Sequence, residues 1–254
     1  MRIRFSGTVP KDEPSTNEDA FFPHEPGTTE RVALSDGASE SYASRKLATL
    51  LVKNFVDPLG DTDFCIDPFL WVDNIRQAYN KACGEFRQMS WSQQGAFERG
   101  SFATLLAFKS DSRRGVRIFW VGDSCVVLLD DGKFRYSVPY DTSAEFQQRP
   151  ELISTIPRHN DFLRSNEFLK TYSRWCPITR KTIILCMTDA LAEWALRRKE
   201  KKRPVWETLC RISDQAALEA LVEGERKARE MRVDDSTLLV IDFTDEKSDG
   251  ISDP

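Results

Sequence analysis

The chain of 254 residues carries 36 Lys and Arg against 40 Asp and Glu, a formal charge of −4, and 40% of its residues are apolar. This composition is typical of a globular protein with a sizeable core, and the length allows one large domain or two small ones. A mildly acidic chain lacks the basic surface that nucleic-acid binding requires. No apolar run reaches the ~18 residues of a membrane helix, and the first residues lack a signal peptide's apolar stretch, so we expect a cytoplasmic protein.

Cysteines and histidines are few and scattered. Six cysteines occur without any Cys-x-x-Cys pair, and the two histidines are His24 and His159. A disulfide framework is denser and belongs to short secreted chains, so the pattern predicts reduced thiols. Zinc sites and nucleophile systems that need histidine have few candidate members here. These counts favour chemistry that depends on carboxylates.

Hydrophobic periodicity predicts the elements in chain order. The first seven residues form a short strand, and a second strand covers 31–35. Two helices follow, each apolar on one face, and a third lies near the end of the chain. The helices are predicted over 39–56, 67–89 and 205–232, and the other strands over 102–109, 116–121, 125–130, 133–137, 182–188 and 237–243.

Short connections determine how several of these strands pair. The runs 116–121, 125–130 and 133–137 are separated by only a few residues, which makes antiparallel hairpins and excludes parallel crossovers. Helices that are apolar on one face need a sheet to cover. We therefore predict an α+β layered fold in one domain over 1–244, with an irregular flap over 139–175 and a flexible tail over 245–254.

Acidic residues stand at the ends of several apolar strands. Any one of them is explained as a turn residue or a helix N-cap. Several in one domain favour a second explanation, because clustered carboxylates repel one another unless a cation neutralises them. Oxygen ligands select Mg²⁺ or Mn²⁺ over zinc, so the pattern predicts a dinuclear metal centre at one rim of a sheet. The residues concerned are Asp19, Asp36, Asp123, Asp189, Asp234 and Asp235.

Six short motifs follow one another over nearly the whole chain: Asn17-Glu18-Asp19-Ala20, Leu34-Ser35-Asp36-Gly37-Ala38-Ser39, Gly100-Ser101-Phe102-Ala103-Thr104, Val121-Gly122-Asp123-Ser124, Thr188-Asp189-Ala190-Leu191 and Asp234-Asp235-Ser236-Thr237-Leu238. In this order they resemble the metal-dependent protein phosphatase family, protein phosphatase 2C, in its bacterial form. The resemblance implies a four-layer α/β/β/α sandwich, in which two antiparallel sheets are flanked by helix pairs.

The resemblance also implies a catalytic centre made of Asp36, Asp189 and Asp234. Asp36 would bridge two metal ions. The carbonyl of Gly37 would bind the second ion, and Asp189 and Asp234 would bind the first.

Further acidic residues would complete this centre by the same resemblance. Glu18 or Asp19 would face the second ion, directly or through water. Asp123, together with Asp189, would hold a third and weaker ion. Asp235 would orient the ligands without binding a metal itself.

Three positions depart from the family pattern. Where the family has an Arg that grips the substrate phosphate, this chain has Pro14, and the nearest cation is Lys11. Lys11 either binds the phosphate as a point charge or is an ordinary solvated lysine in a turn. Ala38 stands where eukaryotic members carry a His that acts as general acid. Ala190 replaces the glycine that usually follows the metal-binding Asp.

We therefore predict a Mg²⁺- or Mn²⁺-dependent phosphomonoester hydrolase, specifically a protein serine/threonine phosphatase with two or three ions. The ions would activate a water for in-line attack on phosphorus. The expected partner is a phosphorylated protein, with no nucleic-acid or membrane partner, and we expect a monomer. Two alternatives remain: a catalytically silent module that binds a phosphorylated partner, and a phosphatase of a small phosphorylated molecule.

Overall fold

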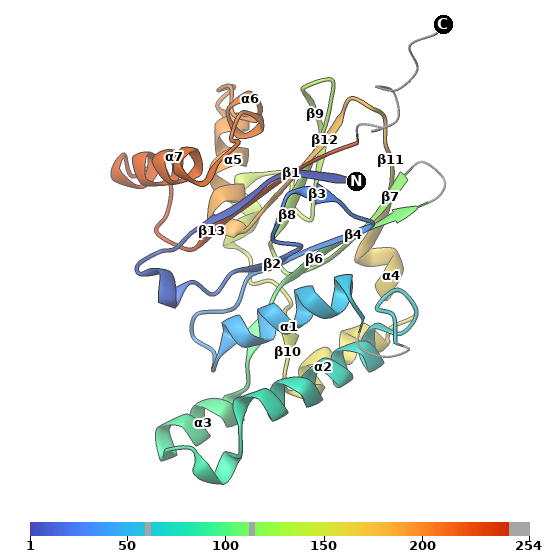
Figure 1. The fold of residues 1–254 in the computed structure, drawn as a ribbon, viewed down its shortest axis with the longest axis vertical. Coiled ribbons are helices and arrows are strands. Elements are labelled where there is room, and N and C mark those ends of the chain that lie inside the picture. The colour runs from blue at the N-terminus through green and yellow to red at the C-terminus, as the bar shows by residue number, and fades with distance from the viewer. Residues whose placement is uncertain (59–61, 112–114, 244–254) are drawn as a thin grey trace, which may run out of the picture.

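Two antiparallel sheets lie face to face at the centre of the molecule (Figure 1). The computed structural model describes residues 1–58, 62–111 and 115–243, and the predicted tail over 245–254 lies outside them. Within these residues, one sheet has the order β3-β1-β13-β12-β8-β9, the other has the order β11-β7-β6-β4-β2, and β10 pairs with β5. The bounds are β1 Arg2–Val9, β2 Ala20–Phe22, β3 Gly27–Thr28, β4 Arg31–Ser35, β5 Phe102–Ala103, β6 Leu105–Asp111, β7 Gly115–Val121, β8 Cys125–Asp130, β9 Lys133–Val138, β10 Ile153–Ser154, β11 Ser173–Pro177, β12 Thr182–Met187 and β13 Ser236–Asp242.

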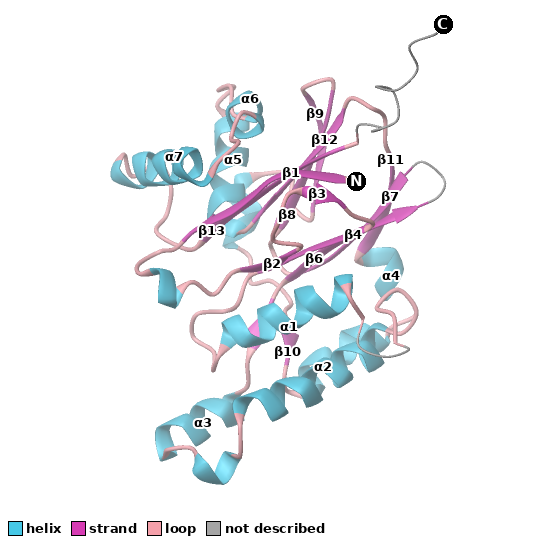
Figure 2. Cartoon of the chain, viewed as in Figure 1, coloured by secondary structure: helices cyan, strands magenta, loops and turns pink. Residues whose placement is uncertain are grey.

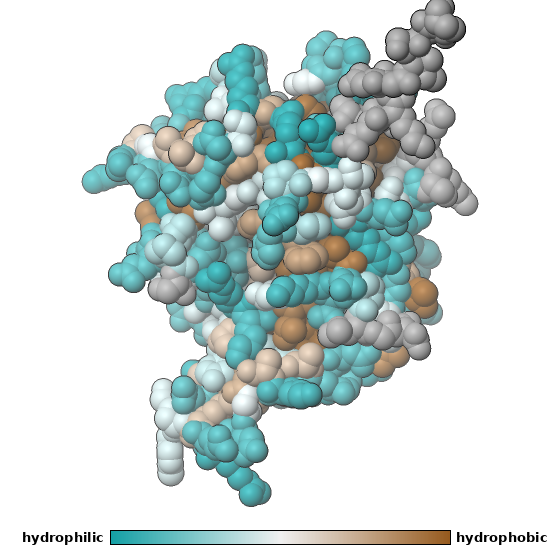
Figure 3. All heavy atoms as spheres, in the orientation of Figure 1, coloured by the Kyte–Doolittle hydropathy of each residue, from teal (hydrophilic) through white to brown (hydrophobic). Residues whose placement is uncertain are grey.

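Helices cover the outer face of each sheet (Figure 2). Helices α1 and α2 pack on the sheet that contains β4, and α5, α6 and α7 pack on the sheet that contains β13. The outer surface seen in Figure 3 is mostly hydrophilic, as expected for helices that bury only one face. No helix in the described ranges is long and apolar enough to span a membrane. The bounds are α1 Ser44–Val56, α2 Pro68–Cys83, α3 Trp91–Arg99, α4 Phe168–Thr171, α5 Asp189–Glu200, α6 Trp206–Cys210 and α7 Gln215–Lys227.

The sandwich has one interface between its two sheets and one between each sheet and its helices, and alternate residues of the central strands fill them. Leu34 of β4 and Ile184 of β12 point between the two sheets, where both are fully buried. Their neighbours Ala33 and Leu185 point to the opposite faces and pack with the helices. Side chains alternate along a strand, so a strand covered on both faces needs a continuous apolar run. The predicted four-layer α/β/β/α arrangement is confirmed.

The helix predicted over 205–232 is two helices, because a cap interrupts it. Helix α6 ends at Cys210, and the Asp214 side chain accepts a hydrogen bond from the Ala217 N–H to begin α7. Such a cap satisfies an amide that a helix start leaves without a partner. Both helices bury apolar residues against the same sheet, so the apolar period continues across the break.

The segment predicted as an irregular flap over 139–175 contains regular elements. It includes β10, α4, the start of β11 and two stretches of 3₁₀ helix. Four apolar side chains anchor it to the body of the molecule: Phe146, Ile153, Leu163 and Phe168. These anchors are spaced irregularly because the elements are short, which is why no period marks them in the sequence.

Candidate functional site

Strand pairing brings the acidic residues singled out above to one end of the sandwich. In the six-stranded sheet, Met187 at the end of β12 pairs with Leu238 near the start of β13 and with Cys125 at the start of β8. In the other sheet, Ser35 at the end of β4 pairs with Ala20 at the start of β2. Each of these strand ends adjoins one or two of the acidic residues: Asp19, Asp36, Asp123, Asp189, Asp234 and Asp235.

Hydrogen bonds from two other motifs position Asp36. Its backbone N–H donates to the Thr104 hydroxyl at 2.8 Å, and the Thr104 N–H donates to the Asp36 carbonyl at 2.8 Å. The Thr104 and Ser124 hydroxyls lie 2.7 Å apart and share a hydrogen bond. Gly122 adopts a φ of +99°, and a Cβ there would lie 2.6 Å from the Thr104 side chain. The Thr104 and Ser124 motifs therefore act as a fixed support for the carboxylate.

Gly37 lies in a space that no larger residue fits. A Cβ at this position would lie 2.8 Å from the Ser44 backbone carbon and 3.0 Å from the Glu18 carbonyl oxygen. The Gly37 N–H donates to that same carbonyl at 3.3 Å. The absence of a side chain thus lets the turn after β4 approach the segment that carries Glu18.

Replacing Gly37 by Ala is expected to destabilise the chain by about 1–3 kcal/mol, because backbone atoms must move to admit the methyl group. Urea unfolding measures the change. Gly224 is the matched control, since it lies inside α7 and a methyl group there would meet no atom within 4 Å beyond the adjacent residues and the backbone of its own helix. Gly224→Ala should stabilise the chain by up to about 1 kcal/mol. Equal effects of the two changes would contradict the close packing at Gly37.

Asp19 is buried with one oxygen satisfied and one without a partner. The hydroxyls of Thr188 and Thr237 donate to its Oδ2 at 3.1 and 2.6 Å. Its Oδ1 is buried and accepts no hydrogen bond. Oδ1 of Asp189 is also buried without a hydrogen-bond partner. Native proteins rarely leave such oxygens unsatisfied, and hard cations bind them well.

The Asp235 side chain connects separate segments of the site by hydrogen bonds. It is 3% exposed, and it accepts hydrogen bonds from the backbone N–H groups of Lys11 and Glu18, both at 2.7 Å. With both oxygens used on backbone donors, Asp235 holds the loop that presents Glu18 and Asp19.

The crowding of acidic groups raises several pKa values. Burial raises the pKa of Asp19 to about 7, and the charges of Asp235 and Asp234 add to this effect. Burial, and then the charges of Asp19, Asp123 and Asp234, raise the pKa of Asp36 well above its usual range. Burial also raises the pKa of Asp123. Without a cation, burial and mutual repulsion therefore make the ionised forms of these carboxylates costly.

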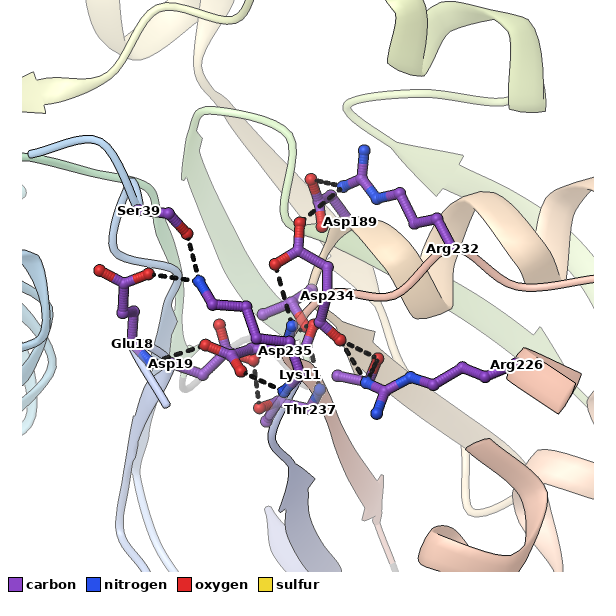
Figure 4. A network of polar contacts seen from close by, with 12 residues as sticks. Lys11, Glu18, Asp19, Ser39, Asp189, Arg226, Arg232, Asp234, Asp235 and Thr237 are labelled. Atoms are coloured by element: carbon purple, nitrogen blue, oxygen red, sulfur yellow. Dashed lines mark hydrogen bonds and ion pairs between the residues drawn. The ribbon is translucent and has the colours of Figure 1, made fainter. Parts of the chain in front are cut away.

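Two basic side chains reach into this cluster (Figure 4). The Lys11 ammonium donates to Glu18 Oε2 at 2.7 Å and also to the Ser39 hydroxyl. Burial lowers the pKa of Lys11, but the hydrogen bond and the charge of Glu18 outweigh burial and raise it. The Arg232 guanidinium forms an ion pair with Asp189 and lies 3.8 Å from Asp234 Oδ2. Lys11 was predicted at this site, whereas Arg232 was not.

Several residues that support the site were missed in the sequence for different reasons. Thr188 and Thr237 lie inside the quoted motifs, but nothing in the motifs shows that both contact Asp19. Arg226 donates to the backbone carbonyls of Pro10 and Asp234, and it lies within the predicted helix over 205–232, where it resembles any exposed arginine.

Different carboxylates of the cluster contact different basic side chains. Glu18 contacts Lys11 and Ser44, whereas Asp189 and Asp234 contact Arg232. Within 1–58, 62–111 and 115–243, no three His, Cys, Asp or Glu side chains lie close enough to hold one metal ion. The donors nevertheless fit a hard cation, because Asp19 and Asp189 each keep a buried oxygen without a hydrogen bond.

Comparison with known proteins agrees with this arrangement. The chain matches the family model described as protein phosphatase 2C over residues 7–224. The structure of the Mycobacterium tuberculosis serine/threonine phosphatase PstP/Ppp superposes with a TM-score of 0.58 at 19% identity, covering 96% of this chain and 100% of that chain. The catalytic domain of PstP in complex with two manganese ions gives 0.58 at 18% identity, covering 96% and 99%.

The photosystem II phosphatase PBCP superposes with a TM-score of 0.60 at 16% identity, covering 94% of this chain and 98% of that chain. Comparison with curated protein sequences finds no significant match. The solved structures share the fold, and the family model spans most of the chain, including the motifs that carry Asp19, Asp36, Asp123 and Asp189. The chain therefore belongs to the protein phosphatase 2C family.

Proposed function

We propose that this chain is a metal-dependent phosphomonoester hydrolase that removes phosphate from phosphoserine or phosphothreonine in proteins, with residues 1–244 as its domain. The observation that carries the proposal is the cluster of carboxylates at one end of the sandwich, in which Asp19 and Asp189 each keep a buried oxygen without a hydrogen bond. Its family membership and the two manganese ions of the similar PstP structure support the same conclusion.

The proposed ligands follow from these contacts. Asp36, Asp189 and Asp234 would hold Mg²⁺ or Mn²⁺, together with the Gly37 carbonyl. Asp123, beside Asp189 at the same rim, is the candidate for a third ion. When bound, the ions lower the pKa of water and neutralise charge on the phosphate.

Asp19 is a better candidate than Glu18 for direct contact with an ion. Both oxygens of Glu18 accept hydrogen bonds, one from Ser44 and one from Lys11. Asp19 uses one oxygen on two threonine hydroxyls and keeps the other buried and unpartnered. Glu18 therefore orients the ammonium of Lys11, the side chain proposed to hold the phosphate.

Metal-dependent turnover tests the function. Para-nitrophenyl phosphate and a phosphothreonine peptide are incubated with the full chain and increasing Mn²⁺ or Mg²⁺. We expect turnover of both substrates, loss of turnover with a chelator, and a higher kcat/KM for the peptide. A sugar phosphate hydrolysed better than the peptide would assign the site to small molecules. Absence of turnover at saturating metal would contradict the proposal.

Replacing Lys11 by Ala is expected to raise KM for a phosphothreonine peptide about tenfold, or ~1–2 kcal/mol of charge-assisted hydrogen bonding. The ammonium already lies in the carboxylate cluster, within bonding distance of Glu18, so a phosphate entering there reaches it. Lys11→Arg should retain part of the affinity. Lys227, which is exposed at the end of α7, is the control, and Lys227→Ala should leave KM unchanged. An unchanged KM for Lys11→Ala would mean that the metals and backbone alone hold the phosphate.

A catalytically silent binding module is the second candidate, and one observation favours it. Lys11 and Arg232 already neutralise part of the carboxylate cluster without any metal. Such a module would bind the phosphothreonine peptide in the presence of a chelator and show no turnover with Mn²⁺. The enzyme is distinguished by binding and turnover that both depend on the metal.

A further inference from the structure

Arg232 lies against the two carboxylates, Asp189 and Asp234, that we propose as ligands of the first metal ion. Its guanidinium contacts Asp189 and lies 3.8 Å from Asp234 Oδ2 (Figure 4). Asp189 begins α5, and Asp234 lies two residues before β13, so the arginine joins two elements across the end of the sandwich. A guanidinium is a planar cation that matches carboxylates well, and here it supplies the positive charge that a metal would supply.

A guanidinium and a divalent cation cannot both occupy this position. Arg232 approaches the Oδ2 atoms of Asp189 and Asp234 and leaves only Oδ1 of Asp189 without a partner, so an ion held by both carboxylates would lie next to the guanidinium. At this short range two cations repel strongly in a partly buried site. We propose that Arg232 competes with the first metal ion and must leave Asp189 and Asp234 before that ion binds. This inference rests on the proposed function, since it takes its two ligands from there.

The surroundings of Arg232 allow it to move. Its side chain is 40% exposed, so little packing holds it against the carboxylates. It lines a pocket of about 650 Å³ whose two acidic residues, Glu193 and Glu230, already form ion pairs with the basic residues Arg197 and Lys201 of the same wall. The displaced guanidinium therefore has space to move into, and its exposure lets water solvate it there.

Arg226, a neighbouring arginine, shows the opposite arrangement. It donates to the backbone carbonyls of Pro10 and Asp234, and it is partly buried beneath the loop before β13. These neutral acceptors do not compete for a metal, and they fix the side chain in place. Arg226 is therefore a structural residue, whereas Arg232 contacts the carboxylates themselves.

Direct measurement of Mn²⁺ binding to the full chain tests the competition. The electron paramagnetic resonance signal of free Mn²⁺ gives the dissociation constant without any substrate. Removing an ion pair of this exposure should tighten the first Mn²⁺ site about two- to fivefold in Arg232→Gln. Arg229→Gln is the matched control, because Arg229 is exposed, lines the same pocket and carries the same charge. It reports the effect of losing one nearby charge without losing the contact to Asp189.

A second readout does not depend on the dissociation constant. Without metal, Arg232→Gln should melt at a lower temperature than the parent chain, since Asp189 and Asp234 lose their shared cation. Saturating Mn²⁺ should remove this difference. Arg229→Gln should melt like the parent in both conditions.

The outcomes separate the inference from the proposed function. Tighter Mn²⁺ binding by Arg232→Gln than by Arg229→Gln supports the competition, and so does Mn²⁺ binding that appears only in Arg232→Gln. Equal affinities of the two variants would overturn the inference and leave the proposed function intact. Absence of Mn²⁺ binding in the parent and in both variants would overturn the inference and the proposed metal dependence together.

Discussion

Replacing Asp36 by Asn should lower turnover about a thousandfold or more while stabilising the metal-free chain. The amide keeps the size of the carboxyl group but lacks the charge needed to bridge two metal ions. Burial and the charges of Asp19 and Asp123 raise the pKa of Asp36 well above its usual range, which shows that its ionised form is costly in the folded chain. Removing that charge should raise the free energy of unfolding at pH 7 by about 1 kcal/mol or more.

Turnover and urea unfolding are measured on the same preparations. Asp131 is the matched control, since it lies in the β8–β9 turn at the opposite end of β8, is largely exposed and has a φ of +51°, which Asn tolerates. Asp131→Asn should leave turnover and stability nearly unchanged. Normal turnover in Asp36→Asn would remove the central carboxylate from the proposed mechanism.

The metal-free chain should lose stability as the pH rises from about 4 to about 7. Burial raises the pKa of Asp19 to about 7 in the folded chain, against 3.8 when it is unfolded. Between these values the folded chain binds a proton that the unfolded chain has released, so the free energy of unfolding falls as the pH increases. Asp19 alone accounts for on the order of 3 kcal/mol, and Asp36 acts in the same direction.

Carboxylates with lowered pKa values change the free energy of unfolding in a different pH range. Asp63, whose pKa is lowered chiefly by the Cys65 N–H and by Arg31 against the opposing effect of burial, contributes stability that is lost only below about pH 4. Urea unfolding in a chelator at a series of pH values measures the slope, and Asp36→Asn should reduce it. Added Mn²⁺ should reverse the slope, because metal ligands must be deprotonated. A metal-free chain whose stability rises steadily from pH 4 to pH 7 would contradict the buried cluster.

The strands and the acidic residues beside them were predictable from local sequence. The run over 182–188 is continuously apolar because β12 is buried on both faces, and it ends where Asp189 begins α5. The short connection between the runs over 125–130 and 133–137 predicts an antiparallel hairpin, and the structure confirms it as β8 and β9. The hairpin predicted between 116–121 and 125–130 is wrong, because β7 and β8 lie in different sheets and the residues between them cross from one sheet to the other. A short connection thus restricts where the next strand begins, but packing between the sheets decides which strand it pairs with.

Helix ends and the flap were less predictable, because they depend on contacts between distant residues. Asp214 divides the helix predicted over 205–232 by accepting one backbone hydrogen bond. In the flap, the short elements around Ile153 and Phe168 are ordered by burial against the sheet and helices, not by any repeat of their own. Propensity is a weak guide where tertiary packing decides the outcome.

The sequence alone determined the family resemblance, the antiparallel layered fold and the acidic residues that lie near one another. Only the tertiary structure decided which charges neutralise them. Arg232 resembles any exposed arginine in the sequence, yet it contacts Asp189, and Lys11 contacts Glu18 rather than solvent. Thr188 and Thr237 likewise meet at one oxygen of Asp19 and leave the other without a partner. Such pairings join segments that are distant along the chain, and their energies depend on burial and separation, which no local pattern encodes.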